Sequence, residues 1–453
     1  MKRFFTLLMV LTIQLSIGQV DKEFWFAVPE VTSQHADRPV YLHLTSFDKE
    51  TRVTISLPAN PQVKDLEVSL AANQSIAIQL DDTFALISDL ENSTPDTPQN
   101  KGLLVESDAN ISAYYEVRGS LVGSGVVNTD IFTLKGTNAL GNELYTPFQS
   151  GLNNYTYGTE PDSWSSIDIV ATDDNTTVTI KPKVAVYGHE ANIAFTVTLN
   201  RGQTYSVRGL EQQANYSMSG THIVSDKKIA VTVKDDSVIL PIGGSWDLIG
   251  DQIVPVESLG LEYLVSEGRN FIVATENDTQ IEYSINSKMP FDTQVLSEGE
   301  TFKINEASMA DASNGLIHIK SNYPVYVFSI QAIGTEFAGA LIPTIECTGS
   351  KKINFTRASD EDLKLELFYK TGSEESFYLN GVEMDINSFV NGSIASTLGK
   401  WSYAYKYFSV EEITPETSVS IENKSSEFHL GVLNGSDITG AQYGFFSSFS
   451  GLE

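Results

Sequence analysis

The stretch Ile169–Ile180 reads IVATDDNTTVTI, and further along the chain the stretch Ile272–Tyr283 reads IVATENDTQIEY. In each copy an apolar run leads into a short acidic turn, which is followed by a segment of alternating polar and apolar residues. Alternation with period two predicts half-buried β-strands, and Asp and Asn favour tight turns. Each stretch therefore predicts two short strands joined as a hairpin.

The similarity between the two copies extends along the chain. Residues 195–207 match residues 293–304 around a glycine turn, and residues 220–233 match residues 315–330 around a Ser-Asp or Ser-Asn turn that predicts a second hairpin. Weaker copies lie upstream and downstream of these two. A period of this length predicts tandem modules that share a core. We expect about four units, which cover 19–150 with a linker, 151–262, 263–350 and 351–453.

The predicted fold class is all-β, because strand-like runs recur at short spacing and amphipathic helical patterns are scarce. Two arrangements fit four antiparallel β repeat units. One is a series of sandwich-like modules, since about six short strands per unit approach a small sandwich. The alternative is a closed β-propeller-like ring in which the apolar segment Tyr443–Ser450 pairs with Phe24–Glu30.

The first 18 residues have the pattern of a secretory signal peptide, with a basic start at Lys2 and Arg3 and a short apolar run that ends at Gly18. The expected mature chain begins near Gln19. We therefore expect a protein that is secreted or held at the cell surface, with the periplasm as the alternative. The rest of the sequence contains no apolar run long enough to predict a transmembrane segment.

The formal net charge of −29 disfavours nucleic acid and anionic membranes as partners, because both carry negative charge. The single cysteine, Cys347, excludes an intramolecular disulfide. It lies in the strand-like segment LIPTIECTG, so a buried thiol is expected.

Residues that carry catalysis are not grouped in any recognisable motif. The six histidines lack metal-ligand spacing, and neither a phosphate-binding glycine loop nor a nucleophile elbow is present. We therefore expect a non-enzymatic protein and assign no catalytic residue. A Ser-His-Asp triad or a pair of carboxylates stays open, because such groups need not be close in sequence.

Acidic turns offer the strongest pattern for a metal. The oxygen-bearing side chains of Asp173, Asp174, Asn175, Asp247 and Asp251 suit calcium, which takes six to eight oxygen ligands. The competing explanation is turn chemistry, because Asp and Asn also stabilise tight turns. We favour turn chemistry, so no cofactor is expected and calcium is the alternative.

Aromatic residues in a polar loop predict a ligand site. Tyr155, Tyr157 and Trp164 lie in the segment Gly151–Ser166, which is rich in Asn, Ser and Tyr. Aromatic faces beside amides bind sugars and peptides on β scaffolds, and loops commonly carry such sites. The alternative is that these rings fill a core.

Several segments together resemble the N-terminal domain of the IgGFc-binding protein family, including its relatives among secreted or surface bacterial proteins. They are DKEFWFAVPE from Asp21, DNTTVTI from Asp174, SWDLIGDQIVPVESLGLEYLV from Ser245, WSYAYKYFSV from Trp401 and AQYGFFSSFSG from Ala441. The resemblance implies an extracellular binding or adhesion module without known catalysis. The expected partner is a glycoprotein, a polysaccharide or a surface protein. The alternatives are a secreted glycan- or peptide-directed hydrolase and a structural subunit of a cell-surface assembly.

Overall fold

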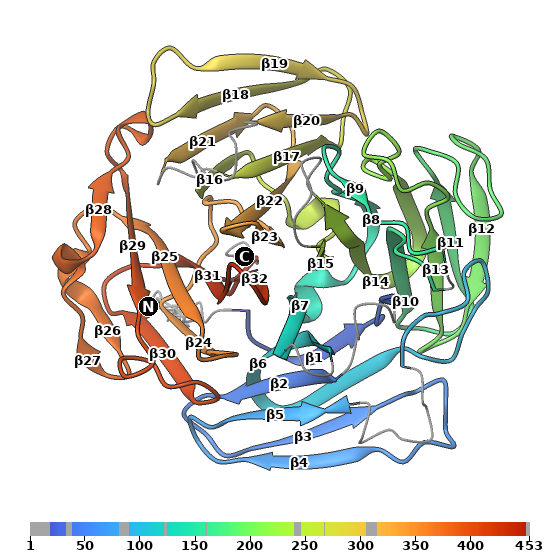
Figure 1. Cartoon of the computed structure of the whole chain (residues 1–453), viewed down its shortest axis with the longest axis horizontal. Coiled ribbons are helices and arrows are strands. Elements are labelled where there is room, and N and C mark those ends of the chain that lie inside the picture. Colours follow the sequence, from blue (N-terminus) through green and yellow to red (C-terminus); the bar gives the residue numbers. More distant parts are fainter. Residues whose placement is uncertain are drawn as a thin grey trace, which may run out of the picture.

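The computed structural model of the chain describes residues 19–32, 39–80, 90–121, 125–158, 161–239, 246–266, 268–304 and 315–449. Within these residues the regular structure is dominated by antiparallel strands, as predicted. Figure 1 shows the strands as four groups around a common centre, coloured from blue through green and yellow to red. None of the described segments forms a helix with the length and apolar character needed to cross a membrane.

The first group shows how one unit is built. The strand β6 is long enough to serve two layers, because it pairs with β1 and β3 near its start and with β2 and β7 near its end. The resulting layers have the orders β1-β6-β3-β4 and β5-β2-β6-β7. The strands of this group are β1 (Asp21–Phe26), β2 (Val40–Ser46), β3 (Thr51–Ser56), β4 (Leu66–Leu70), β5 (Ser75–Gln79), β6 (Leu103–Leu121) and β7 (Gly125–Leu134).

The second group repeats this strand order around the long strand β14. Its layers are β8-β14-β11-β12 and β13-β10-β14-β15, and the short β9 pairs with the far end of β14. The strands are β8 (Gly141–Tyr145), β9 (Asn153–Asn154), β10 (Ser166–Ala171), β11 (Thr176–Lys181), β12 (Phe195–Leu199), β13 (Thr204–Arg208), β14 (His222–Ile239) and β15 (Trp246–Ile253). The strand β8 lies within residues 19–150, the range expected for the first unit and its linker, but it pairs with β14 of the second group. The exact boundaries between the units stay a prediction.

In the third group the long strand is divided into β21 and β22, and Pro324, which lacks a backbone N–H, precedes β22. The layers are β16-β21-β18-β19 and β20-β17-β22-β23. The strands are β16 (Glu262–Ser266), β17 (Arg269–Ala274), β18 (Thr279–Ile285), β19 (Asp292–Leu296), β20 (Thr301–Ile304), β21 (Leu316–Ser321), β22 (Val325–Ile333) and β23 (Glu336–Leu341).

The fourth group keeps the same order with its long strand divided into β30 and β31. Its layers are β24-β30-β26-β27 and β29-β25-β31-β32, with β28 added beside β29. The strands are β24 (Lys352–Thr356), β25 (Asp362–Lys370), β26 (Phe377–Leu379), β27 (Val382–Glu383), β28 (Val390–Ser393), β29 (Trp401–Phe408), β30 (Ser418–Asn423), β31 (Phe428–Ser436) and β32 (Gly440–Phe445). All four groups are therefore sandwich-like.

The two predicted hairpins are wrong in their pairing, although their strands are present. β10 and β11 flank the turn at Asp173 but lie in opposite layers, because each pairs with a different half of β14. Ser225 and Asp226 lie inside β14, where the strand passes from one layer to the other. Alternation specifies that a segment is a strand, but it does not specify which strand is its partner.

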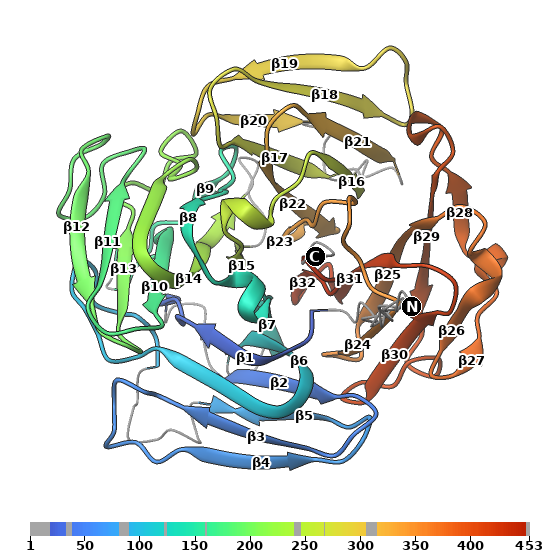
Figure 2. The same cartoon turned by 180° about the vertical axis from the view of Figure 1, so that it is seen from behind.

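The four sandwiches form a ring around β7, β15, β23 and β32, which contact one another in that order and close from β32 back to β7 (Figures 1 and 2). The first and the last described segments meet at the last joint, where Gln19 N donates to Phe446 O at 3.2 Å. β1 pairs with β6 and β32 with β31, so the ring closes without the predicted pairing of 443–450 with 24–30.

Buried carboxylates join the central strands of neighbouring units. The Asp130 carboxylate on β7 accepts a hydrogen bond from Gly250 N on β15 at 3.1 Å. The Asp251 carboxylate on β15 accepts from Thr133 N at 3.1 Å and from Leu341 N on β23 at 3.0 Å. These side chains satisfy backbone donors that a buried strand edge must otherwise leave unpaired.

Close packing of the central strands requires glycine at two positions. A Cβ on Gly250 would lie 2.3 Å from the Phe132 ring, and a Cβ on Gly339 would lie 2.3 Å from Ile249 Cγ2. Both distances are too short for two carbon atoms that are not bonded. The ring therefore depends on small residues where one central strand crosses the next.

The expectation of a buried cysteine is wrong. The strand β23 ends at Leu341, and Cys347 lies beyond it in an exposed turn with φ of 55°. The apolar residues that suggested a longer strand, Ile342 and Ile345, are buried on either side of Pro343 but lie beyond the end of β23.

Candidate functional site

An aromatic cluster on the second unit contains two of the three predicted ligand residues. The rings of Tyr155 and Tyr157 lie 4.9 Å apart in an edge-to-face arrangement, and Trp246 lies 4.6 Å from Tyr155. Tyr155 and Trp246 are each 37% exposed. The cluster forms because β9 pairs with the end of β14, where Ile239 is in register with Trp246. We call Tyr155, Tyr157 and Trp246 the aromatic surface.

The loop that carries the two tyrosines is organised by Asp162. Its carboxylate accepts hydrogen bonds from Tyr157 N at 2.8 Å, Gly158 N at 3.0 Å and Ser163 N at 2.8 Å. Burial would raise the pKa of Asp162, but these backbone hydrogen bonds outweigh it and hold the pKa below its ordinary value. These hydrogen bonds fix the backbone at Tyr157 and Gly158 relative to Asp162.

A second carboxylate supports the loop from below. Asp235 is buried and accepts hydrogen bonds from Gln149 Nε2 at 2.8 Å, Asn154 Nδ2 at 2.6 Å and Ser165 Oγ at 2.7 Å. Burial raises the pKa of Asp235, and the three hydrogen bonds oppose that rise. Asn154 directly precedes Tyr155, so this network fixes the chain where the aromatic surface begins.

The structure places Trp164, the third predicted residue, in a different contact. The Arg208 guanidinium carbon lies 5.1 Å from the Trp164 ring centroid and 4.8 Å from that of Tyr187. Trp246 takes the place predicted for Trp164. The sequence contained a signal for it, because Trp246 begins a strand next to a turn, but its neighbour across the sheet depends on the register of β14 and β15.

The predicted calcium residues do not form one group. Asp173, Asp174 and Asn175 lie in the exposed turn between β10 and β11, where Asn175 has a φ of 54° and Asp174 Oδ1 accepts from Arg201 N at 3.0 Å. These features are those of a tight turn. Asp174, Asn175 and Arg201 also line a groove of about 490 Å³.

Asp247 and Asp251 lie instead on the buried central strand β15. Burial, together with the negative charge of Glu336, raises the pKa of Asp247 well above its ordinary value. Asp251 forms an ion pair with Lys135 Nζ at 2.8 Å, and its role is the bridging of central strands described above. Throughout the residues that the structure describes, His, Cys, Asp and Glu side chains form no group of three or more that can hold a metal ion.

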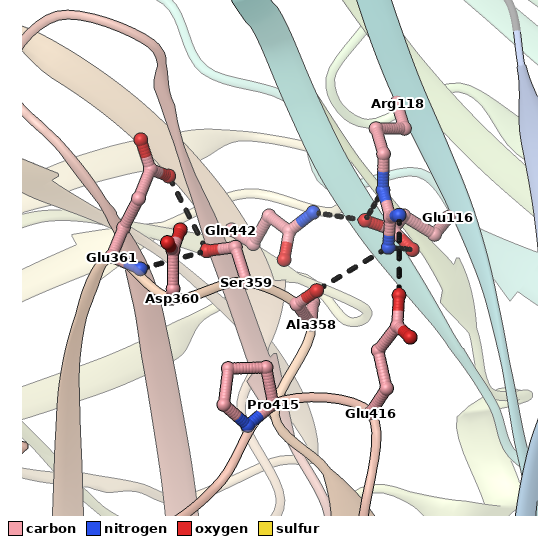
Figure 3. Close-up of a pocket in the computed structure, with 9 residues that line it drawn as sticks. All are labelled: Glu116, Arg118, Ala358, Ser359, Asp360, Glu361, Pro415, Glu416 and Gln442. Carbon is pink, nitrogen blue, oxygen red and sulfur yellow. Dashed lines mark hydrogen bonds and ion pairs between the residues drawn. The ribbon is translucent and has the colours of Figure 1, made fainter. Parts of the chain in front are cut away.

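A pocket at the joint between the first and fourth units was not predicted (Figure 3). Its volume is about 300 Å³. β6 supplies two of its side chains, β32 supplies one, and two loops of the fourth unit supply the others. The lining residues are Glu116, Arg118, Ala358, Ser359, Asp360, Glu361, Pro415, Glu416 and Gln442. The sequence gives no signal for this pocket, since its walls are about three hundred residues apart in the chain.

A buried ion-pair network forms the floor of the pocket. The Glu116 carboxylate, 1% exposed, accepts from His43 Nε2 at 2.6 Å, Arg118 Nη2 at 2.9 Å and Gln442 Nε2 at 2.7 Å. Burial would raise the pKa of Glu116, but the His43 hydrogen bond and the charges of His43 and Arg118 lower it to about 2. Glu116 is therefore ionised at neutral pH.

The pocket has an excess of negative charge. Figure 3 shows Glu416 opposite the Arg118 guanidinium, and Asp360 and Glu361 on the facing loop. Arg118 pairs with Glu116 at 2.9 Å and with Glu416 at 3.9 Å, so the four carboxylates of the lining share this one cation among the lining residues. By charge and size, the pocket can accommodate the cationic end of a lysine or arginine side chain.

One arrangement resembles a catalytic triad. His318 Nδ1 lies 3.0 Å from Ser396 Oγ, and His318 Nε2 lies 2.6 Å from Glu262 Oε1. Ser396 is 7% exposed and His318 is 1% exposed, so the hydroxyl is covered. The second unit contains the same pair at equivalent strands, His222 with Glu143 at 2.9 Å. Repetition of the pair favours a structural role.

The chain was compared with curated proteins, with solved structures and with models of protein families. No curated protein matches the chain. A solved structure described as a tetra-tandem repeat in the extending region of a large adhesion protein aligns with 95% of this chain and 99% of that chain. Its identity is 8% and its TM-score is 0.10, which is too low to support an argument.

Residues 130–433, more than half of the chain, match the family described as IgGFc binding protein. This span runs from β7 to β31 and contains the whole aromatic surface. The chain therefore belongs to the IgGFc-binding protein family.

Proposed function

We propose that the chain is an exported, non-catalytic binding and adhesion module that recognises a glycoprotein, a polysaccharide or a surface protein. It acts outside the cytoplasm, either secreted or at the cell surface. The family description names an antibody Fc region, which makes a glycoprotein the first class of partner to test. The resemblance noted in the sequence supports the same class of function.

The observation that carries this proposal is the aromatic surface. Exposed apolar rings are unfavourable in water, and Tyr155 on the loop and Trp246 at the start of β15 each present a partly exposed ring on which a ligand can stack. A sugar ring presents C–H groups that pack on Tyr155 and Trp246, while its hydroxyls find hydrogen-bonding partners in the polar loop. Because backbone hydrogen bonds hold Tyr155 and Tyr157 in place, less entropy is lost when a ligand binds to them.

The test is a glycan and glycoprotein array probed with the mature chain. The double variant Tyr155→Ala/Trp246→Ala should lose the signal, because it removes both exposed rings. Tyr323→Ala is the matched control, since Tyr323 is 42% exposed on another unit. An unchanged signal in the double variant would show that the aromatic surface is not the site.

Two further arms separate the alternatives. Chelation of calcium tests the turn at Asp173, Asp174 and Asn175, and a signal lost on chelation and in Asp173→Asn would support calcium binding there. If the array gives no signal at all, cross-linking of the chain on intact cells tests a protein partner. Products that contain only copies of this chain would instead support a structural subunit.

A further inference from the structure

The joint that closes the ring contains Gln19, the residue at which the mature chain is expected to begin. Gln19 is 4% exposed. Its backbone nitrogen donates to Phe446 O at 3.2 Å, and its side-chain Nε2 donates to Phe445 O at 2.8 Å. The two nitrogens of one residue are therefore held against consecutive carbonyl groups at the C-terminal end of β32.

Cleavage after Gly18 would change the chemistry of this site. The backbone nitrogen of Gln19 would become an α-amine, which carries a positive charge at neutral pH. A buried charge is costly unless an opposite charge pairs with it, and the acceptors here are neutral carbonyl oxygens. A mature chain with a free amine at Gln19 would therefore hold a positive charge against two neutral acceptors at the joint.

We propose that Gln19 is a modification site, at which the mature N-terminus is cyclised to pyroglutamate. The α-amine nitrogen attacks the side-chain Cδ, the N–Cδ bond forms, and the Cδ–Nε2 bond breaks. Nε2 leaves as ammonia and takes the proton that the amine loses. The step is an intramolecular aminolysis, so it needs neither an oxidant nor a second substrate, and a glutaminyl cyclase accelerates it.

The product fits the joint better than the free amine. The lactam is neutral and retains one N–H, which can donate to Phe446 O as the backbone nitrogen does now. The hydrogen bond from Nε2 to Phe445 O is lost. Loss of one neutral hydrogen bond costs less than holding a positive charge against neutral acceptors at the joint. This inference rests on the export that we propose above.

The test uses the full chain, expressed with its first 18 residues and purified after export. Tandem mass spectrometry of the N-terminal peptide should show a start at Gln19 and a mass lower by one ammonia. A synthetic peptide of residues 19–30, taken through the same digestion, measures cyclisation caused by handling. The cyclised fraction of the protein should exceed that of the peptide several-fold.

Gln19→Asn is the matched variant, because its shorter amide would have to close a strained four-membered ring. It should keep a free amine, and its melting temperature should be lower than that of the cyclised chain. A peptide that begins at Gln19 with an intact amide would overturn the cyclisation and leave the export standing. A peptide that begins at Met1 would overturn both.

Discussion

Replacement of Glu116 by Gln should lower the free energy of unfolding by an amount that follows from the lowered pKa of Glu116. Gln has the shape of a protonated Glu but cannot carry the charge that His43 and Arg118 stabilise. The pKa of Glu116 falls from an ordinary 4.5 to about 2. At about 1.4 kcal/mol for each tenfold change, this corresponds to about 3 kcal/mol at pH 7. Because Glu116 is 1% exposed, solvent screening does not reduce this figure.

The shift in the pKa of Glu116 also predicts how the loss of stability in Glu116→Gln depends on pH. Because the folded-state pKa is lowered, the stabilisation by Glu116 is present above its ordinary pKa and is lost as the pH falls toward 2. The difference between wild type and Glu116→Gln should therefore fall from its value at pH 7 to about half near pH 3. Comparing the two proteins at each pH cancels the titration of the other carboxylates.

Urea unfolding followed by tryptophan fluorescence gives the free energy of unfolding of both proteins without adding salt. Glu416→Gln is the control, since Glu416 lines the same pocket but is 69% exposed. It should change the free energy by less than about 0.5 kcal/mol. A difference for Glu116→Gln that stays constant between pH 7 and pH 3 would refute the electrostatic argument, because lost packing does not titrate.

Three other perturbations follow from the centre of the ring and from the exposed thiol. Asp251→Asn should cost about 3–5 kcal/mol in urea unfolding because it leaves Lys135 buried and uncompensated, and adding Lys135→Met should restore part of the loss. Gly339→Ala should cost about 1–3 kcal/mol because its Cβ would meet Ile249, and an unchanged melting temperature would disprove the close approach. Cys347 should be alkylated by iodoacetamide in the folded chain, and the melting temperature should not depend on reductant.

The fold class could be predicted from the sequence because alternation and repetition are local properties. IVATDDNTTVTI and IVATENDTQIEY each contain two strands at the expected places, and Gly202 and Gly299 have positive φ at the turns that their repetition indicated. Whether two consecutive strands pair or lie in opposite layers is decided by a third strand. The hairpins were therefore mispredicted although the strands were correct.

The candidate site was also predictable only in part, because local composition was informative and pairing between strands was not. The loop that carries Tyr155 and Tyr157 was recognisable from its composition. Its third aromatic residue was not, because Trp246 reaches the loop through the register of β14 and β15. The pocket at Arg118 could not be predicted from the sequence, because it forms only where the first and fourth units contact each other.

The bridging carboxylates at the centre of the ring have an evolutionary consequence. Tandem repeats commonly gain and lose copies by recombination, because neighbouring copies can substitute for one another. Asp130 belongs to the first unit and Asp251 to the second, and each serves backbone donors of particular neighbours. Deleting or duplicating one unit would leave a buried carboxylate facing the wrong strand. The copies are therefore no longer interchangeable. The hydrogen bonds that distinguish them fix the number of copies in the ring.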